Sequence, residues 1–323
     1  MAYAINLANH TFVQTIPNPK VACVIVNPLG KIVAEGVHGE SGIDHAEVIA
    51  LARAGTDAMG STAYVTLEPC AHTGRTGPCV DALLSAGIKR VVFASKDPLN
   101  GGEALLRQKG IEVVDGMLEK EATETFAPWL HTVECQTPYV TLKIASTLDG
   151  YIAASDGTSQ WITSEESRHY VQKIRLEVDG IVTSTNTVKH DNPHYTVRDY
   201  AVDVQPHVYV LGKSALENFS NIDGRFTSVN SHNPKDLLNT ASTDGKKHLL
   251  IEAGGLVAGA FLKANLVNRL IWISAPMMLG DGVSAVKGLG ISSLKDALKG
   301  QIIEQFAVGE DAVTVLRMNR CSH

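Results

Sequence analysis

The first half of the chain alternates short apolar runs with stretches of helical periodicity. Apolar runs bounded by turn residues are typical of buried strands, and apolar positions three to four residues apart are typical of a helix. We therefore predict helices at 45–54 and 103–109, and strands at 21–26, 31–37, 62–68, 90–95 and 111–114. A turn containing Pro28 and Gly30 joins the first two strands into a hairpin. The alternation predicts an α/β unit whose mostly parallel sheet is covered by helices on both faces.

A second α/β pattern begins after residue 138. We predict a helix at 165–176 and strands at 139–146, 180–183, 208–211, 248–252 and 269–274. Residues 212–247, which are rich in Ser, Asn and Asp, indicate mostly loop. The segment 131–138 interrupts the pattern and ends in Pro138. We therefore place one domain at 1–134, a linker at 135–138 and a second domain at 139–323.

The composition is that of an ordinary globular protein. A length of 323 residues suits two domains at roughly 150 residues each. No apolar stretch approaches the roughly 18 residues that a membrane span needs, and the N-terminus lacks a signal peptide, so we expect a cytoplasmic protein without membrane association. A net charge of -6 does not favour nucleic acid as a partner. Five cysteines form an odd, sparse set, which fits a reduced compartment better than a disulfide framework.

Four residues form a constellation typical of zinc chemistry, namely His45, Glu47, Cys70 and Cys79. One imidazole and two thiolates would leave the fourth position of a tetrahedral Zn²⁺ open, as in a catalytic site. Pro69 suits a first helical position, so we expect both Cys70 and His45 at helix N-termini, where the dipole lowers the pKa of a thiol. Glu47 is the candidate catalytic residue, a proton shuttle for water that attacks an amidine-like ring carbon.

Two interpretations without a metal remain open. The thiols could be buried beside a helix-capping histidine, or Cys70 and Cys79 could form a disulfide, although a cytoplasmic location disfavours the disulfide.

The spacing of the two cysteines connects the chain to a known family. The segment CAHTGRTGPC places eight residues between them, whereas the cytidine-deaminase superfamily has two. Together with PNPKVACVIV at 17–26, this insert resembles the bifunctional riboflavin-biosynthesis deaminase-reductase family, and the resemblance covers nearly the whole chain. It implies an N-terminal cytidine-deaminase-like α/β/α sandwich and a C-terminal dihydrofolate-reductase-like α/β domain.

The resemblance also implies substrate-binding residues in the deaminase half. These are Asn18, His72 and Arg75. Each has a plainer alternative: Asn18 could shape a turn between two prolines, Arg75 could be a solvated loop charge, and His72 could be polar surface.

Reductase residues rest on the resemblance alone, because the second half has no G-x-G-x-x-G run. The implied cofactor-binding residues are Ala145, Trp161, Thr187, Asp191, Gly254, Gly255 and Gly259. The implied reductase substrate-binding residues are Ser159, Arg175, Arg198 and Glu252. Glycines before a helix let backbone N–H groups approach an anionic cofactor, and two arginines can bind a phosphate.

Several of these residues could also be structural. Trp161 could belong to the core, Gly254 and Gly255 could form a tight turn, and Arg175 could lie on a solvated helix face. Lys143, at a strand end, is a further candidate that could equally be solvated.

The implied reactions are hydrolytic deamination of 2,5-diamino-6-(5-phosphoribosylamino)pyrimidin-4-one and then NADPH-dependent reduction of its ribosyl side chain to ribityl. The family also implies a homo-oligomer. Two alternatives stay open at this point: a deaminase whose second domain is impaired or only binds nucleotide, and a non-catalytic ligand-binding regulator. The sequence does not separate NADPH from NADH.

The chain departs from the family pattern at several positions. The loop KDPLNGGEAL is shortened, which puts contacts from Asp97 and Asn100 in doubt. Ser184 stands where Gly is usual, and Ala253 interrupts a Glu-Gly-Gly run. Added side chains near a pyrophosphate can obstruct backbone approach, so we expect the reductase to be the weaker activity. Smaller departures are Thr147 for Ser and Gly77 for Pro.

Overall fold

The computed structural model describes residues 1–39, 42–73, 77–213, 221–222 and 224–318. The chain divides into two compact units, Met1–Leu130 and His131–His323. Helix α6 (Ala127–Cys135) spans the division, so the segment that we expected to interrupt the pattern is helical as far as Cys135. The division falls a few residues before the linker predicted at 135–138. No helix in the described part of the chain is long and apolar enough to cross a bilayer.

The first unit is built on a five-stranded sheet with the order β2-β1-β3-β4-β5. Its strands are β1 (Ala22–Val26), β2 (Ile32–Val37), β3 (Thr62–Leu67), β4 (Arg90–Ser95) and β5 (Glu112–Val114). Strands β3, β4 and β5 are parallel, but β1 is antiparallel to both β2 and β3. The predicted hairpin of β1 and β2 is confirmed, but the parallel part of the sheet is limited to β3, β4 and β5, because β1 also pairs antiparallel with β3.

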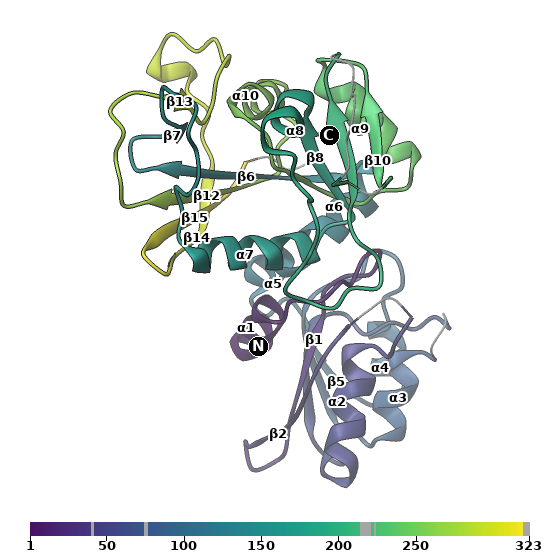
Figure 1. Ribbon diagram of the computed structural model, residues 1–323. Helices are drawn as coiled ribbons and strands as arrows, with labels where there is room; N and C mark the ends of the chain where they lie inside the picture. The colour runs from purple at the N-terminus through teal and green to yellow at the C-terminus, as the bar shows by residue number, and fades with distance from the viewer. Residues whose placement is uncertain (40–41, 74–76, 214–220, 223, 319–323) are drawn as a thin grey trace. The chain divides into compact units, whose positions relative to one another are not determined.

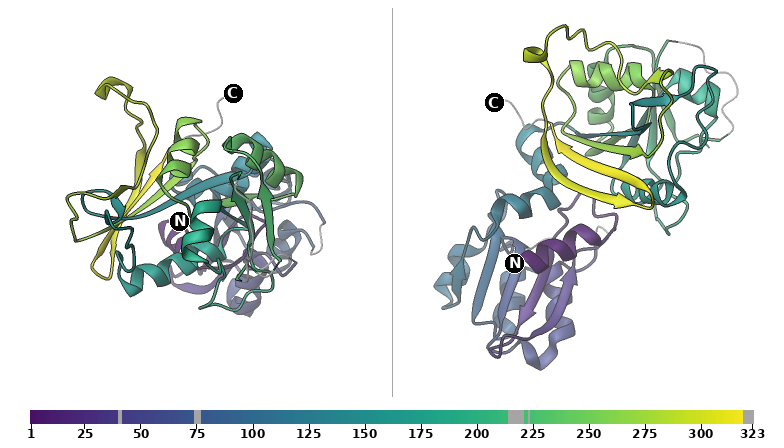
Figure 2. Two further views of the ribbon diagram at one scale, coloured as in Figure 1. Left: turned by 45° about the horizontal axis from the view of Figure 1, so that its top comes forward. Right: turned by 90° about the vertical axis from the view of Figure 1, so that its left-hand side faces the viewer.

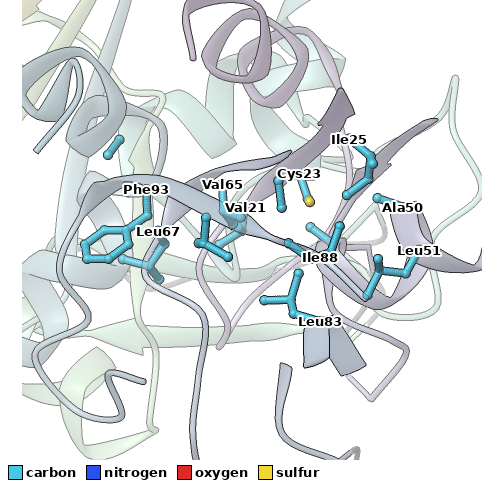
Figure 3. Close-up of a cluster of buried hydrophobic side chains, with 14 of the residues drawn as sticks. Val21, Cys23, Ile25, Ala50, Leu51, Val65, Leu67, Leu83, Ile88 and Phe93 are labelled. Carbon is cyan, nitrogen blue, oxygen red and sulfur yellow. The ribbon is translucent and has the colours of Figure 1, made fainter. Parts of the chain in front are cut away.

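Helices cover both faces of this sheet, as predicted (Figure 1). Helices α2 (Ala46–Ala54), α3 (Cys79–Ser85) and α4 (Glu103–Gln108) lie on one face, and α1 (Ala2–His10) and α5 (Glu119–Thr125) lie on the other. Figure 3 shows the core between sheet and helices, where Cys23 and Val65 of the strands face Leu51 of α2 and Leu83 of α3. Burial of these apolar side chains is the main stabilising contribution in this unit.

One glycine lets α2 approach the sheet closely. A Cβ on Gly36 of β2 would overlap the carbonyl oxygen of Ala46 and the backbone nitrogen of Ala50. The first turn of α2 therefore rests directly on the backbone of β2, and His45, which precedes that turn, is fixed against the sheet.

The second unit contains an eight-stranded sheet with the order β10-β9-β8-β11-β6-β12-β15-β14. Its strands are β6 (Tyr139–Thr147), β8 (Gly180–Ser184), β9 (His207–Leu211), β10 (Phe226–Val229), β11 (His248–Ile251), β12 (Arg269–Ala275), β14 (Gln301–Val308) and β15 (Asp311–Arg317). The six strands from β10 to β12 are parallel, and β14 and β15 add an antiparallel hairpin at one edge, coloured yellow in Figure 2. A separate two-stranded sheet joins β7 (Tyr151–Ala153) to β13 (Val283–Ser284).

The helices of the second unit pack into two separate apolar clusters. Side chains of α9 (Pro234–Thr243) and α10 (Gly255–Lys263) join one cluster, and those of α7 (Glu165–Leu176) and α8 (Thr185–Asp191) join the other. These clusters draw on different residues of the same strands, so the parallel part of the sheet is covered on both faces.

The prediction of mostly loop at 212–247 is wrong where β10 and α9 form. Pro234 occupies the first turn of α9, and the side chain of Asn233 caps the helix by accepting the backbone N–H of Lys235. Leu237 and Ala241 are fully buried. An N-cap hydrogen bond and two buried apolar side chains stabilise this helix, although the polar composition of the segment did not indicate it.

Candidate functional site

The three proposed zinc ligands come from three separate segments. His45 is the residue that caps α2, and Cys79 is the first residue of α3. Cys70 follows β3 and forms an isolated bridge with Gly101. The expectation that Cys70 begins a helix is therefore wrong: the long insert delays the helix until Pro78 and Cys79. The backbone N–H of Cys79 nevertheless reaches the Cys70 sulfur at 3.5 Å.

The ligand atoms converge as a tetrahedral zinc site requires. His45 Nδ1 lies 3.1 Å from Cys79 Sγ and 3.6 Å from Cys70 Sγ, and the three atoms lie within 4.8 Å of one another. Zinc bonds of about 2.0–2.3 Å place tetrahedral ligand atoms at roughly this separation. One imidazole and two free thiols, all buried or half-buried, therefore fit Zn²⁺ with a fourth position left for water. The disulfide between the two cysteines is not formed.

The two thiols are electrostatically coupled. The hydrogen bond from the Cys79 thiol, helped by His45, lowers the pKa of Cys70 to about 4. The same contact raises the pKa of Cys79, because the second thiolate would form beside the first. A divalent cation would stabilise both thiolates at once, because its two positive charges balance their two negative charges.

Glu47 lies in the first turn of α2 and is 4% exposed. Burial raises the pKa of its carboxyl to about 7. A carboxyl with that pKa beside a set of metal ligands can accept a proton and return it near neutral pH.

A cavity of about 230 Å³ opens beside this cluster, within the first unit. His45, Glu47 and Cys70 line it, and so do the predicted substrate residues Asn18 and His72. Arg75 lies outside the described residues. The structure thus brings together all described residues that we predicted for the deaminase half.

His38 is a cavity residue that sequence reasoning missed. Its Nε2 lies 3.1 Å from Asn18 Nδ2, and its Nδ1 lies 3.2 Å from the carbonyl oxygen of Asp44. His38 is 3% exposed, and its ring meets that of His45 edge to face. Asn18 is therefore held in place as part of the cavity wall and does more than shape a turn.

Five further residues of the cavity wall were not singled out as substrate residues from sequence. They are Glu68, Asp97, Leu99, Asn100 and Trp129. Asp97 and Asn100 belong to the shortened loop, which therefore still reaches the cavity. No local signal marks Trp129, because it comes from α6, far along the chain.

In the second unit, Arg175 and Glu252 form a buried ion pair. Arg175 Nε and one terminal nitrogen donate to the two carboxylate oxygens at 2.7 and 3.0 Å. The other terminal nitrogen donates to the carbonyl oxygen of Thr196 at 3.1 Å, and Lys143 Nζ lies 3.6 Å from the Glu252 carboxylate. Burial alone would raise the pKa of Glu252, but Arg175 and Lys143 overcome it and lower that pKa to about 2. Arg175 is thus not a solvated helix residue, and Lys143 belongs to the same charged cluster.

Tyr195 is a further residue of this buried cluster, and we did not predict a role for it from sequence. Its hydroxyl lies 2.6 Å from Thr183 Oγ1 and donates to the carbonyl oxygen of Glu252 at 3.2 Å. Its φ of 49° is unusual for a bulky residue. The surrounding hydrogen bonds and burial stabilise a backbone conformation that would otherwise be costly.

The three predicted cofactor glycines differ in their surroundings. A Cβ on Gly255 or Gly259 would overlap backbone carbonyl oxygens of Ser284 and Lys287, whereas a Cβ on Gly254 would meet nothing within 4 Å. Gly254 precedes α10 and leaves its N-terminus approachable. Helix packing therefore explains glycine at 255 and 259, whereas a side chain at 254 would meet no neighbour.

Other predicted reductase residues lie at or near the carboxyl ends of the parallel strands or in loops. Ala145 lies near the end of β6, and the hydroxyl of Ser184, which ends β8, accepts the backbone N–H of Thr187 and so caps α8. Ser184 therefore has a structural role as the N-cap of α8. Asp191 is the last residue of α8.

The remaining reductase candidates are exposed. Ser159, Trp161 and Arg198 all lie in loops, and Trp161 is 66% exposed. The guanidinium of Arg168 lies 4.4 Å from the centre of the Trp161 ring. Trp161 is therefore not a core residue.

Comparison with known proteins places both units in one family. Residues 1–95 match the cytidine and deoxycytidylate deaminase zinc-binding region, and residues 138–314 match the RibD C-terminal domain. The chain is 39% identical to riboflavin biosynthesis protein RibD of Mycobacterium tuberculosis H37Rv, over 94% of this chain and 91% of that protein. It is 37% identical to RibD of Escherichia coli K12, over 96% of each.

Two solved structures share the fold over nearly the whole chain. Acinetobacter baumannii RibD, form 1, matches with a TM-score of 0.83 and 34% identity, covering 99% of this chain and 98% of that one. The diaminohydroxyphosphoribosylaminopyrimidine deaminase/5-amino-6-(5-phosphoribosylamino)uracil reductase of Thermotoga maritima matches with a TM-score of 0.83 and 29% identity, over 99% and 97%. Together with the zinc ligand set and the two α/β units, these matches show that the chain belongs to the RibD family, the bifunctional zinc-dependent deaminases and NADPH-dependent reductases of riboflavin biosynthesis.

Proposed function

We propose that the first unit deaminates 2,5-diamino-6-(5-phosphoribosylamino)pyrimidin-4-one and that the second unit then reduces the ribosyl side chain of the product to ribityl. The observation that carries the deaminase assignment is the convergence of His45, Cys70 and Cys79 beside Glu47 at one cavity. Zinc held by these three ligands supplies the Lewis acidity that makes water nucleophilic near neutral pH.

Glu47 moves the protons of the deamination. Its carboxylate takes a proton from the attacking water as the oxygen bonds to the ring carbon that carries the exocyclic amine. The same carboxyl then gives a proton to the departing nitrogen, so that ammonia leaves and a carbonyl remains. Burial of Glu47 keeps this proton away from bulk solvent.

Asn18 and His72 are proposed to orient the pyrimidine nucleotide in the cavity, together with Arg75. Support for the first two comes from their place in the cavity wall. The hydrogen-bond contact between Asn18 and His38 restricts the rotation of the amide, which favours a single orientation of the bound base.

For the reductase, the roles implied by the resemblance are proposed with two revisions. Ala145, Trp161, Thr187, Asp191 and Gly254 are proposed to contact NADPH, whose nicotinamide supplies the hydride. Ser159, Arg198 and Glu252 are proposed to face the open-chain sugar phosphate. Arg175 instead fixes the Glu252 carboxylate through their bidentate contact, and Gly255 and Gly259 permit the packing of α10.

A homo-oligomer in the cytoplasm is the proposed state of the protein. The edge strand β14 leaves Ile302 56% exposed, which supports association through the second unit. The zinc ligands must stay reduced thiols, which supports a reducing compartment. Light scattering on purified protein would measure the mass, and a monomer would contradict the first proposal.

The proposed reactions are tested in sequence on zinc-loaded protein. Ammonia release from the diaminopyrimidine nucleotide is measured first, and NADPH is then added while its absorbance is followed. Ammonia followed by NADPH oxidation supports both steps. Ammonia release without NADPH oxidation would overturn the reductase proposal. Absence of both signals would overturn the assignment of this nucleotide as the substrate.

A further inference from the structure

Glu68 is a buried carboxylate in the cavity wall to which the proposed mechanism assigns no role. It follows β3 directly, two residues before the zinc ligand Cys70, and is 7% exposed. Its two oxygens accept backbone N–H groups from Asp97 at 3.1 Å and from Glu103 at 2.8 Å. One carboxylate therefore binds both ends of the loop 97–103.

The middle of this loop is also attached to the segment that carries Cys70. The backbone N–H of Ala71 donates to the carbonyl oxygen of Asn100 at 3.0 Å, and Cys70 forms a bridge with Gly101. A Cβ on Gly101 would lie 2.5–2.6 Å from the carboxylate atoms of Glu68, so a side chain at this position would displace the carboxylate.

The same loop supplies one wall of the cavity, through Asp97, Leu99 and Asn100. Leu99 is held in a turn because its backbone N–H donates to the side chain of Asp97 at 2.8 Å. The position of these three side chains relative to the zinc ligands therefore depends on how firmly both loop ends are held.

We propose that Glu68 is a positioning residue for deamination: its carboxylate fixes the substrate-facing loop 97–103 at a set position relative to the Cys70 ligand. The inference rests on the proposed deaminase function. Backbone amides bonded to a buried carboxylate form strong hydrogen bonds, and an uncharged amide cannot accept from both donors with both of its polar atoms.

The first experiment replaces the carboxylate without changing its size. In Glu68→Gln, one loop end loses its acceptor, so we expect the KM for the diaminopyrimidine nucleotide to rise roughly tenfold. Because the proposed mechanism gives Glu68 no part in proton transfer, kcat should change by less than about threefold. Zinc should remain at one per chain, and the reductase activity of the same protein should be unchanged.

A second variant tests the same idea while keeping Glu68. Gly101→Ala places a methyl group against the carboxylate and should raise KM in the same way. The matched control is Glu112→Gln, which removes an exposed ion pair with Arg90 in the same unit and should leave both kinetic constants unchanged.

Amide hydrogen exchange of the 97–103 peptide gives a readout that does not depend on activity. We expect exchange roughly tenfold faster in Glu68→Gln than in the wild type. Unchanged exchange in this loop, an unchanged KM, or zinc loss that accounts for the whole defect would each overturn the positioning role. Failure of the wild type to release ammonia would overturn the proposed function instead, and the exchange rates would still decide whether Glu68 holds the loop.

Discussion

Arg175 and Glu252 lie 77 positions apart in sequence and meet in a buried, two-pronged ion pair, with N–O distances of 2.7 and 3.0 Å. Each side chain is about nine-tenths buried, at 12% and 8% exposure. The pair links α7 to the end of β11, where Lys143 of the adjacent strand β6 also reaches the carboxylate. The pair therefore lies among the residues proposed for the reductase site and holds their strands and helix together.

Removal of the arginine should destabilise the second unit. Arg175→Met leaves Glu252 buried with only the more distant Lys143, and we expect a loss of about 3 kcal/mol in unfolding free energy. The double variant Arg175→Met with Glu252→Leu should recover part of this loss, because it removes the buried carboxylate and leaves only Lys143 without its partner. Urea unfolding of the three proteins measures the effect. Equal stability of wild type and single variant would show that the pair is not coupled to folding.

Replacement of Glu47 should separate the two activities. Glu47→Gln keeps the shape of the side chain but cannot accept the proton, so deamination should fall by about 10²–10⁴-fold. Zinc content and NADPH oxidation with the already deaminated substrate should be preserved. Retention of more than a tenth of the deaminase rate would exclude Glu47 as the proton carrier.

Removal of the metal should abolish deamination and leave reduction intact. Dialysis against a chelator should take zinc below detection, and added Zn²⁺ should restore ammonia release. Cys79→Ser should lower zinc occupancy, whereas Cys23→Ser, which changes a buried thiol outside the ligand set, should keep it. Metal analysis together with ammonia release checks this, and deamination by zinc-free protein would contradict the assignment.

The glycines near α10 should respond differently to alanine. Gly259→Ala forces a methyl group against the backbone of Lys287 and should cost roughly 1–3 kcal/mol of stability. Gly254→Ala meets no neighbour and should leave stability unchanged, yet it should raise the KM for NADPH if the cofactor approaches here. Thermal unfolding and NADPH titration check the two effects. A stability loss in Gly254→Ala would contradict the distinction.

His248 should make the stability of the second unit depend on pH. Burial lowers the pKa of this histidine to about 3, and its ring nitrogens contact Thr141 Oγ1 and the carbonyl oxygen of Glu177. The unfolded chain takes up a proton below about pH 6.5, whereas the folded one stays neutral down to about pH 3. The contribution of His248 is therefore fully present above pH 6.5 and decreases as the pH falls.

The expected loss between pH 6.5 and pH 5 is roughly 2 kcal/mol, at about 1.4 kcal/mol per pH unit. Unfolding of wild type and His248→Gln across this range measures it, because glutamine stays neutral and should flatten the curve. The exposed His10→Gln is the matched control. Parallel curves for wild type and His248→Gln would contradict the prediction.

Much of this protein could be predicted from local sequence. The proposed zinc ligands could be picked out because His45, Cys70 and Cys79 are rare residue types at a recognisable spacing, and the structure confirms that they converge. The helix at 165–176 and the strand at 90–95 were placed correctly because the periodicity of apolar side chains follows directly from helix and strand geometry.

Tertiary structure decided what depends on contacts between distant segments. Strand β1 pairs antiparallel with β3, and Cys70 meets Gly101 in place of starting a helix, because strand pairing is selected by the whole sheet. The same holds for Glu68 with the 97–103 loop, for Gly259 with Lys287 and for Arg175 with Glu252. Local periodicity reports which face of an element is buried, but the partner of a polar or glycine residue is fixed only when the elements pack.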